Sequence, residues 1–336
     1  RIPLKYNTRG GGNGPSNLQR KNGEMSTIIA ELERFGPGRH PEPPPLRDAE
    51  RYCRSLAMGH YENFPIASVL LPRRTRQHLF NIYAYCRWAD DLGDEAGSPD
   101  RACELLAWWR SELEACYAGR VTHPVFVALQ PTISRFDLPI TLFADLLSAF
   151  EQDQRVTRYE DFARLVDYCR RSANPVGRLV LAVFEQASDE NIRDSDSVCT
   201  GLQLANFWQD VSRDLDLGRI YLPLEDLHRF GYGQEQLQLR ETNEAFQEMM
   251  RFEVARAREF LLAGRPLAER LSGRLGLSIE LFAGGGLRIL ERIETMGYRV
   301  LERRPVVTKF DMLRLAAASL GRTIFRPLTQ RREGSL

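Results

Sequence analysis

The sequence lacks a CxxC pair, a run of about 18 apolar residues and a secretory signal. The first absence argues against a zinc site or a thioredoxin-type motif, and the second argues against a membrane-spanning helix. Excess charge of one sign is also missing, because 46 Lys and Arg against 45 Asp and Glu give a formal net charge of +1. Nothing in this balance marks a nucleic-acid binder. The composition is otherwise that of an ordinary globular protein, and a chain of 336 residues is long enough to form a substantial core.

Cysteine is scarce and scattered. Several of the six cysteines fall inside helical apolar patterns, where Cys usually acts as a small buried hydrophobe. The six are Cys53, Cys86, Cys103, Cys116, Cys169 and Cys199. We therefore expect a reduced, cytoplasmic protein.

Composition divides the chain into four segments. Residues 1–24 are rich in Gly, Asn and Arg and lack periodicity, which indicates an expression leader or a disordered extension. A mitochondrial-type presequence is the alternative, since this stretch is basic, although its glycines argue against it. Residues 25–46 are expected to form an N-terminal loop segment, 47–325 a single domain and 326–336 a tail.

Helical periodicity dominates the domain, and strand-type alternation is nearly absent, which predicts an all-α fold of about ten helices. A long helix is expected from Pro72 to Glu95, and Gly97–Asp100 predicts a break before the next. A second break is expected at Asn174–Pro175, and residues 219–223 should leave helix. Further helices are predicted at 139–152, 159–171, 175–186, 192–216, 241–262, 277–296 and 309–322.

The predicted helix that ends at Glu95 carries its acidic residues on an unusual face. At about 100° per residue, Asp90 and Asp94 continue the apolar stripe of Leu79, Tyr83 and Cys86. A surface helix would place such carboxylates opposite its apolar stripe. These two are therefore expected to point where the core points, with an arginine, Arg87, beside them.

A second helix repeats this arrangement about 120 residues later, by the sequence numbering. Its polar residues share one face of a helix that is otherwise largely apolar. They are Gln203, Asn206, Asp210 and Asp214. Because a helix that is apolar on most sides is buried, this polar stripe should line an interior cavity.

Two facing pairs of carboxylates would repel each other and would be costly to desolvate, so a positive ligand should bind between them. Carboxylates and an Asn carbonyl are hard oxygen ligands, which suit Mg²⁺. Mg²⁺ completes its shell with waters and substrate phosphate oxygens, which points to a diphosphate substrate. A structural network of salt bridges with arginines is the alternative.

Several segments resemble the squalene/phytoene synthase family. Residues 83–95 (YAYCRWADDLGDE) look like its first aspartate-rich motif and residues 201–223 (GLQLANFWQDVSRDLDLGRIYLP) like its second. HYENFP (60–65) and YCRRSANPVG (168–177) are similar to two further family segments, and the likeness covers about residues 47–325. Within the family, the residues of these segments are similar to those of the bacterial hydroxysqualene synthases of the hopanoid pathway.

The resemblance implies an isoprenoid synthase helical bundle around a central cavity. It also implies Mg²⁺-dependent conversion of presqualene diphosphate and water to hydroxysqualene and diphosphate, a lyase reaction. The implied functional partners are a presqualene diphosphate synthase and a flavin-dependent reductase. The apolar product is compatible with brief contact with a membrane surface.

The resemblance also implies roles for individual residues, by their matching positions in the family motifs. The implied metal ligands are Asp90, Asp94, Asn206, Asp210 and Asp214, with Arg87 and Tyr168 as further catalytic residues. The implied substrate-binding residues are His60, Tyr61, Asn63, Phe64, Tyr83, Asn174, Gln203, Arg219, Tyr221, Arg304 and Lys309. Tyr61, Phe64, Phe207 and Trp208 could stabilise a carbocation, but for Phe207 and Trp208 core packing is the favoured interpretation.

The sequence also departs from the family pattern. Many condensing members carry Arg where this chain has Gln209, and an aromatic residue of a late helix is replaced within Gly284–Gly286. Fewer cations suit one diphosphate rather than two. The alternatives are a condensing prenyltransferase, which makes presqualene diphosphate, squalene or phytoene, and a catalytically inactive assembly factor.

Overall fold

The computed structural model describes residues 27–39, 42–59, 73–271, 273–308, 311 and 314–315. This part of the chain forms helices and no strand, which confirms the predicted all-α class. The helices are α1 (Thr27–Phe35), α2 (Leu46–Gly59), α4 (Arg73–Asp94), α5 (Pro99–Tyr117), α6 (Pro124–Phe136), α7 (Ile140–Asp153), α8 (Phe162–Ser172), α9 (Asn174–Val183), α10 (Asp189–Asp216), α11 (Leu224–Arg229), α12 (Gln234–Gln238), α13 (Glu244–Ala263), α14 (Pro266–Arg270) and α15 (Gly273–Thr295).

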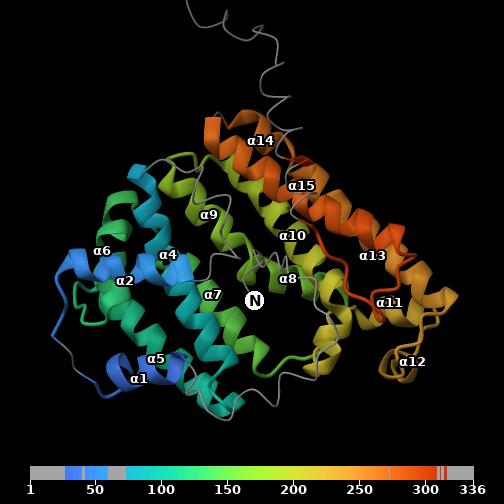
Figure 1. Cartoon of the computed structure of the whole chain (residues 1–336), viewed down its shortest axis with the longest axis horizontal. Coiled ribbons are helices and arrows are strands. Elements are labelled where there is room, and N and C mark those ends of the chain that lie inside the picture. Colours follow the sequence, from blue (N-terminus) through green and yellow to red (C-terminus); the bar gives the residue numbers. More distant parts are fainter. Residues whose placement is uncertain are drawn as a thin grey trace, which may run out of the picture.

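The helices build two adjoining cores (Figure 1). Helices α1, α2 and α4–α7 pack around the first, and α10, α13 and α15 around the second. The predicted motif helices α4 and α10 thus belong to different cores. Helix α9 packs against both of them and joins the two halves.

The first core contains a cluster of aromatic rings. Trp88 of α4 stacks on Trp109 of α5 at 5.1 Å, and the ring of His123 stands edge-on to both. Burial lowers the pKa of His123 to about 3, so its ring is neutral. Its Nδ1 accepts a hydrogen bond from the backbone N–H of Val125 and caps the start of α6.

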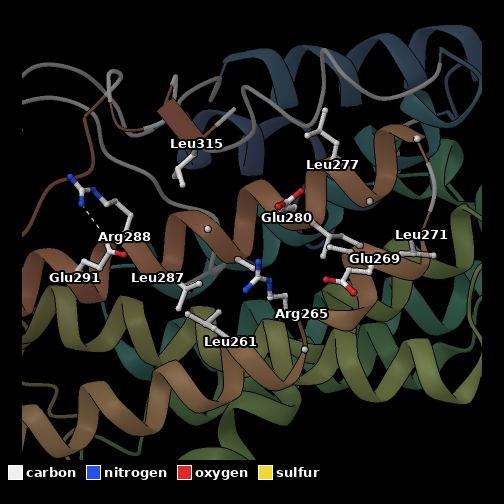
Figure 2. Close-up of a pocket in the computed structure, with 17 residues that line it drawn as sticks. Leu261, Arg265, Glu269, Leu271, Leu277, Glu280, Leu287, Arg288, Glu291 and Leu315 are labelled. Carbon is white, nitrogen blue, oxygen red and sulfur yellow. Dashed lines mark hydrogen bonds and ion pairs between the residues drawn. The ribbon is translucent and has the colours of Figure 1, made fainter. Parts of the chain in front are cut away.

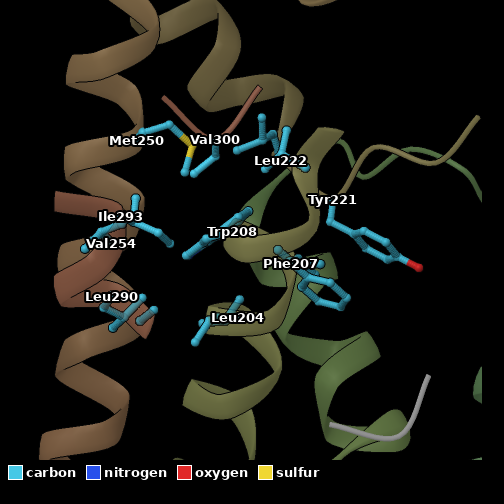
Figure 3. Close-up of a cluster of buried hydrophobic side chains, with 14 of the residues drawn as sticks. Leu204, Phe207, Trp208, Tyr221, Leu222, Met250, Val254, Leu290, Ile293 and Val300 are labelled. Atoms are coloured by element: carbon cyan, nitrogen blue, oxygen red, sulfur yellow. The ribbon is translucent and has the colours of Figure 1, made fainter. Parts of the chain in front are cut away.

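The second core encloses α10. Figure 3 shows Trp208 pointing into a cluster with Val254 of α13 and Ile293 of α15. The indole Nε1 donates to the backbone oxygen of Glu253 at 3.1 Å. This residue is therefore packed in the core, as the sequence favours, while Phe207 and Tyr221 lie on another side of α10.

Helices α10 and α13 approach each other closely at a glycine. A Cβ atom built at Gly201 would lie 2.9 Å from the backbone nitrogen of Leu261. Gly264, just past α13, is similarly close to α10, because a Cβ there would lie 2.5 Å from the carbonyl oxygen of Asp194. Glycine at these positions lets α10 sit tightly against its support.

The breaks are largely where the sequence predicts them. Ser98 caps α5 before Pro99, one residue separates the end of α8 from the start of α9 at Asn174, and residues 219–223 are not helical. The helix expected up to Glu95 ends at Asp94. The boundaries of the other predicted helices shift by a few residues, because capping and tertiary packing select the terminal residue.

Two expectations were wrong. The segment 25–46, expected to be a loop, contains α1, whose buried Ile28 packs into the first core. Helix α6 was not predicted; it contains Pro131, but a buried face that includes Phe126 and Leu129 holds it. In both cases, burial of apolar surface outweighs a weak local preference.

Other expectations concern cysteine, membrane spans and the undescribed segments. All six cysteines are free, and Cys53, Cys86, Cys116 and Cys169 are buried, as expected for small hydrophobes. No helix in the described ranges has the length and apolarity needed to cross a membrane. The expected leader at 1–24 and most of the helix predicted at 309–322 lie outside the described residues.

Candidate active site

The first acidic motif lies in the last two turns of α4. Asp90 is 3% exposed, so it points inward as predicted, whereas Asp94 is exposed at the end of the helix. Arg87 contacts Asp90 and the neighbouring carboxylate of Asp91: its Nε donates to Asp91 Oδ2 at 2.8 Å, and its Nη1 is 3.6 Å from Asp90 Oδ2. Burial raises the pKa of Asp91, and Arg87 opposes this rise.

The second acidic motif lies in the last third of α10. Asp214 is 2% exposed and Gln203 1% exposed, so both lie inside the protein, as the polar-stripe argument requires. Asp210 forms an ion pair with Arg304, which comes from the segment after α15. Arg304 therefore contacts a predicted metal ligand, and the sequence did not predict that contact.

Gln203 has the most unusual environment in this stripe. Neither its Nε2 nor its Oε1 has a hydrogen-bond partner among the described residues, although the side chain is buried. Buried amides are normally satisfied. This position therefore suits a polar ligand, and its place beside the diphosphate stays a prediction.

Arg219 links the two motifs. It follows the end of α10, and its Nη1 lies 3.9 Å from Asp94 Oδ1 of α4. Its Nη2 donates to the backbone oxygen of Asp153 at 3.5 Å. The end of the second family motif, GRIYLP (218–223), is thus brought to the exposed carboxylate of Asp94 in the first motif.

Aromatic rings lie beside this link. Tyr221 stacks on Phe207 at 3.9 Å with an interplanar angle of 9°, and Tyr168 lies 6.1 Å from Tyr221. Phe207 was expected to be core packing, and it does belong to the second core, at 3% exposure. Electron-rich faces gathered in this way are also suited to a cationic ligand.

Asp153 is a buried residue of this region that the sequence did not single out. It ends α7, is 6% exposed, and its Oδ2 accepts a hydrogen bond from the Tyr168 hydroxyl at 2.8 Å. Burial raises the pKa values of both groups. A sequence signal was hardly available, because Asp153 has no DxxxD partner and falls at a helix end.

Two other predicted residues are buried near the motif helices. The Asn174 side-chain oxygen accepts a hydrogen bond from Thr200 Oγ1 of α10 at 3.0 Å. Tyr83 of α4 packs with Ala57 and Phe80 in a small apolar cluster. His60, Tyr61, Asn63, Phe64 and Lys309 lie outside the described residues.

The acidic residues do not form a closed metal cage. Over the residues that the structure describes, no group of three or more His, Cys, Asp and Glu side chains is gathered closely enough to hold a metal ion. Mg²⁺ usually takes one or two carboxylates and completes its shell with water and phosphate oxygens. Two separate aspartate pairs and the unsatisfied Gln203 amide fit a metal ion that binds together with a diphosphate.

A groove elsewhere contains none of the predicted site residues. It has a volume of about 570 Å³ and lies between α13, α14 and α15 (Figure 2). Leucines including Leu261 and Leu287 line it, and Arg265 and Glu280 are among its charged lining residues. The carboxylates of α4 and α10, rather than this groove, locate the candidate active site.

Comparison with known proteins identifies one family. The squalene/phytoene synthase family model matches residues 57–311. A phytoene synthase from Arthrospira platensis is 34% identical over 277 residues, which cover 77% of this chain and 88% of the relative. A hydroxysqualene synthase from Rhodopseudomonas palustris is 36% identical over 238 residues, which cover 70% and 80%.

Solved structures agree as well. The squalene synthase HpnC from Alicyclobacillus acidocaldarius is 42% identical with a TM-score of 0.72, and the match covers 75% of this chain and 95% of that one. A dehydrosqualene synthase, 23% identical, has the same fold with a TM-score of 0.74. With both aspartate-rich helices in place, the chain belongs to the squalene/phytoene synthase family, whose members act on isoprenoid diphosphates.

Proposed function

We propose that this protein converts presqualene diphosphate and water to hydroxysqualene and diphosphate, with Mg²⁺ as its metal ion. The hydroxysqualene synthase at 36% identity and the HpnC structure at 42% support this choice. Phytoene synthases match over a larger share of the chain. Head-to-head condensation of two prenyl diphosphates is therefore the second candidate.

The environment of Gln209 carries the proposal. The side chain is 4% exposed, and its Nε2 donates to the backbone oxygen of Pro305 at 2.7 Å. Many condensing members have Arg at the matching position, whereas this amide brings no positive charge and is engaged with the backbone. A site with one cation fewer suits a substrate with one diphosphate rather than a pair of substrates with two.

The residues of the chain then have distinct tasks. A bound metal ion would supply Lewis-acid stabilisation of the leaving diphosphate, and Asp90, Asp94, Asn206, Asp210 and Asp214 would hold it. Arg219 and Arg304, which contact Asp94 and Asp210, would donate charge-assisted hydrogen bonds to the diphosphate oxygens. These bonds favour the departing group because negative charge grows on it.

The reaction itself breaks one C–O bond and forms another. The bonding pair leaves with the diphosphate, and the cyclopropylcarbinyl cation rearranges. A water oxygen then bonds to the rearranged carbon and releases one proton. The faces of Tyr168, Phe207 and Tyr221 offer the cation an apolar, electron-rich surface, and the low exposure of these rings limits how many waters can reach it.

A product assay tests the proposal. The purified full chain is incubated with Mg²⁺, without NADPH, and with either presqualene diphosphate or farnesyl diphosphate. We expect hydroxysqualene from the former and no consumption of the latter. Consumption of farnesyl diphosphate alone would establish the condensing alternative, and no turnover of either substrate would favour the inactive assembly factor.

A further inference from the structure

We propose that Asp153 is a positioning residue of the active site, which orients the Tyr168 hydroxyl so that its oxygen accepts a hydrogen bond from the water that captures the cation. The inference deepens the proposed function and rests on it. It concerns a side chain that lies outside both aspartate-rich motifs. Four observations carry it.

The first observation is where Asp153 lies. It is the last residue of α7, and its backbone oxygen accepts from Arg219, which in turn lies 3.9 Å from Asp94. The next residue, Gln154, donates from its side chain to the backbone oxygen of Gly93 in α4 at 3.2 Å. The end of α7 is thus tied to the first motif and to the segment that follows the second.

The second observation is the direction of the Tyr168 hydrogen bond. The phenol has one proton, and at 2.8 Å from Asp153 Oδ2 that proton is committed to the carboxylate. The Tyr168 oxygen can then act only as an acceptor toward any other group. An acceptor is what a water nucleophile needs, because it leaves a lone pair of the water free to attack.

The third observation is that no guanidinium group is hydrogen-bonded to the Asp153 carboxylate among the described residues, and the charge of Arg219 offsets only part of the rise in its pKa that burial causes. Its Oδ1 has no hydrogen-bond partner among the described residues, and Arg219 donates to its backbone rather than to its carboxylate. Asp226, equally buried, shows the contrasting case: Arg256 donates to both of its oxygens, at 2.8 and 3.3 Å. An acid retained without such compensation costs stability, which indicates that Asp153 has a functional rather than a stabilising role.

The fourth observation is the packing of Tyr168 itself. Its ring lies 6.2 Å from Phe207 and 6.1 Å from Tyr221, which stack on each other. The ring plane is therefore held by neighbours. Only the direction of the hydroxyl O–H bond can still vary, and the hydrogen bond to Asp153 fixes that direction.

A double-mutant cycle tests the proposal. We compare Asp153→Leu, Asp153→Asn, Tyr168→Phe and the double variant Asp153→Leu/Tyr168→Phe with the wild-type protein. The measurements are kcat, KM, product distribution and melting temperature. The substrate is whichever isoprenoid diphosphate the wild-type protein consumes, so failure of the proposed function appears in the wild type and failure of this inference appears in the cycle.

We expect Asp153→Leu to lower kcat by about 10- to 100-fold with KM changed less than about threefold, and Tyr168→Phe to have a similar effect. The double variant should be no slower than Tyr168→Phe alone. Asp153→Asn, which keeps an acceptor oxygen, should recover part of the loss. It also preserves the test if Asp153→Leu does not fold.

The matched control is Asp226→Asn, a buried aspartate whose ion pair lies outside the site. It should lower the melting temperature and leave kcat within about twofold, as for loss of a structural contact. The proposal is overturned if Asp153→Asn and Asp153→Leu retain wild-type kcat. It is also overturned if the effects of Asp153→Leu and Tyr168→Phe multiply fully in the double variant.

Discussion

The two aspartate-rich helices differ in where their positive charge comes from. In α4, Arg87 is one turn before the carboxylates and reaches Asp90 and Asp91 within the same helix. In α10, Asp210 meets Arg304, which lies 94 residues later in the sequence. Similar motifs are therefore neutralised in one case by helical spacing and in the other by the tertiary fold.

This difference has a consequence for ligand binding. Arg87 can keep its contact with Asp91 while Asp90 binds a metal ion. Arg304, in contrast, pairs with Asp210, a predicted metal ligand, so a metal ion bound there would alter this ion pair. Gln209 holds the Arg304 segment against α10, because its Nε2 donates to the carbonyl oxygen of Pro305. The second motif is thus the one whose charge balance depends on the ligand.

The largest expected effect comes from removing one carboxylate of each motif. Asp90→Ala and Asp210→Ala should each lower kcat/KM by at least about 100-fold, because the leaving diphosphate loses stabilisation. Asp216→Ala is the control, since Asp216 lies on the same helix, is exposed and pairs with Arg240. Full turnover by Asp90→Ala would show that the first motif does not hold the metal ion.

Replacing the two arginines tests the comparison directly. Arg304→Gln should lower kcat/KM by about 10- to 100-fold, the value of a charge-assisted hydrogen bond or two. Arg87→Gln should have a smaller effect, since its main partner is Asp91, which is not among the predicted metal ligands. Steady-state kinetics at saturating Mg²⁺ measure both variants. A larger loss for Arg87→Gln would reverse the comparison.

The helices also differ in how tightly they are packed, which glycine substitutions probe. Alanine gains about 1 kcal/mol over glycine inside a helix. At Gly201 of α10 the new methyl would meet the Leu261 backbone, so overpacking should exceed this gain and cost about 1–3 kcal/mol of unfolding free energy.

The matched substitution in α4 is Gly93→Ala. Its Cβ would lie 3.3 Å from the end of the flexible Gln154 side chain, which can move. Unfolding in urea should show little change or a small gain for Gly93→Ala. Equal losses at both glycines would mean that α4 is packed as tightly as α10.

The smallest expected effect concerns the anchor of the Arg304 segment. Asp311 is buried, which by itself raises its pKa, but hydrogen bonds from Thr308 and the guanidinium groups of Arg288 and Arg292 lower it well below its usual value. A carboxyl with a lowered pKa stabilises the fold above its unfolded pKa of 3.8, and this contribution is lost as pH falls below it.

Asp311→Asn should therefore reduce the melting temperature at pH 7, by about 2–4 °C per kcal/mol lost in a chain of this size. The difference from the wild type should shrink as the pH is lowered below about 4. Thermal unfolding at several pH values measures this effect. A difference that is constant with pH would show that the carboxylate charge is not what anchors the segment.

The sequence predicted much of the site, and the reason is helical periodicity. The inward direction of Asp90, the buried polar stripe of α10 and the position of Arg87 follow from residues three and four apart. The structure confirms the burial of Asp90, Gln203 and Asp214 and the contact of Arg87 with Asp90, whereas Asn206 and Asp210 are only partly buried. In α4, Asp94 is the exception. It shares the face of Asp90, but it is the last residue of α4 and is exposed, because no further turn of the helix covers it.

The late-helix glycine Gly286 lies in close contact with two other helices. A Cβ there would lie 2.8 Å from Leu202 of α10 and 3.1 Å from Leu261 of α13, so this glycine serves helix packing. Wheel geometry places Gly286 on a face of α15 but does not reveal which helix that face meets. Only the packing of three helices decides it.

By itself, the sequence determined the all-α class, both acidic stripes and the pairing of Arg87, because each depends on contacts within one helix. The tertiary structure alone brought Arg304 to Asp210, Arg219 to Asp94 and Tyr168 to Asp153. These partners lie 94, 125 and 15 residues apart and belong to different segments. No local period relates such residues, since their distance is set by how helices pack, and packing depends on the whole core.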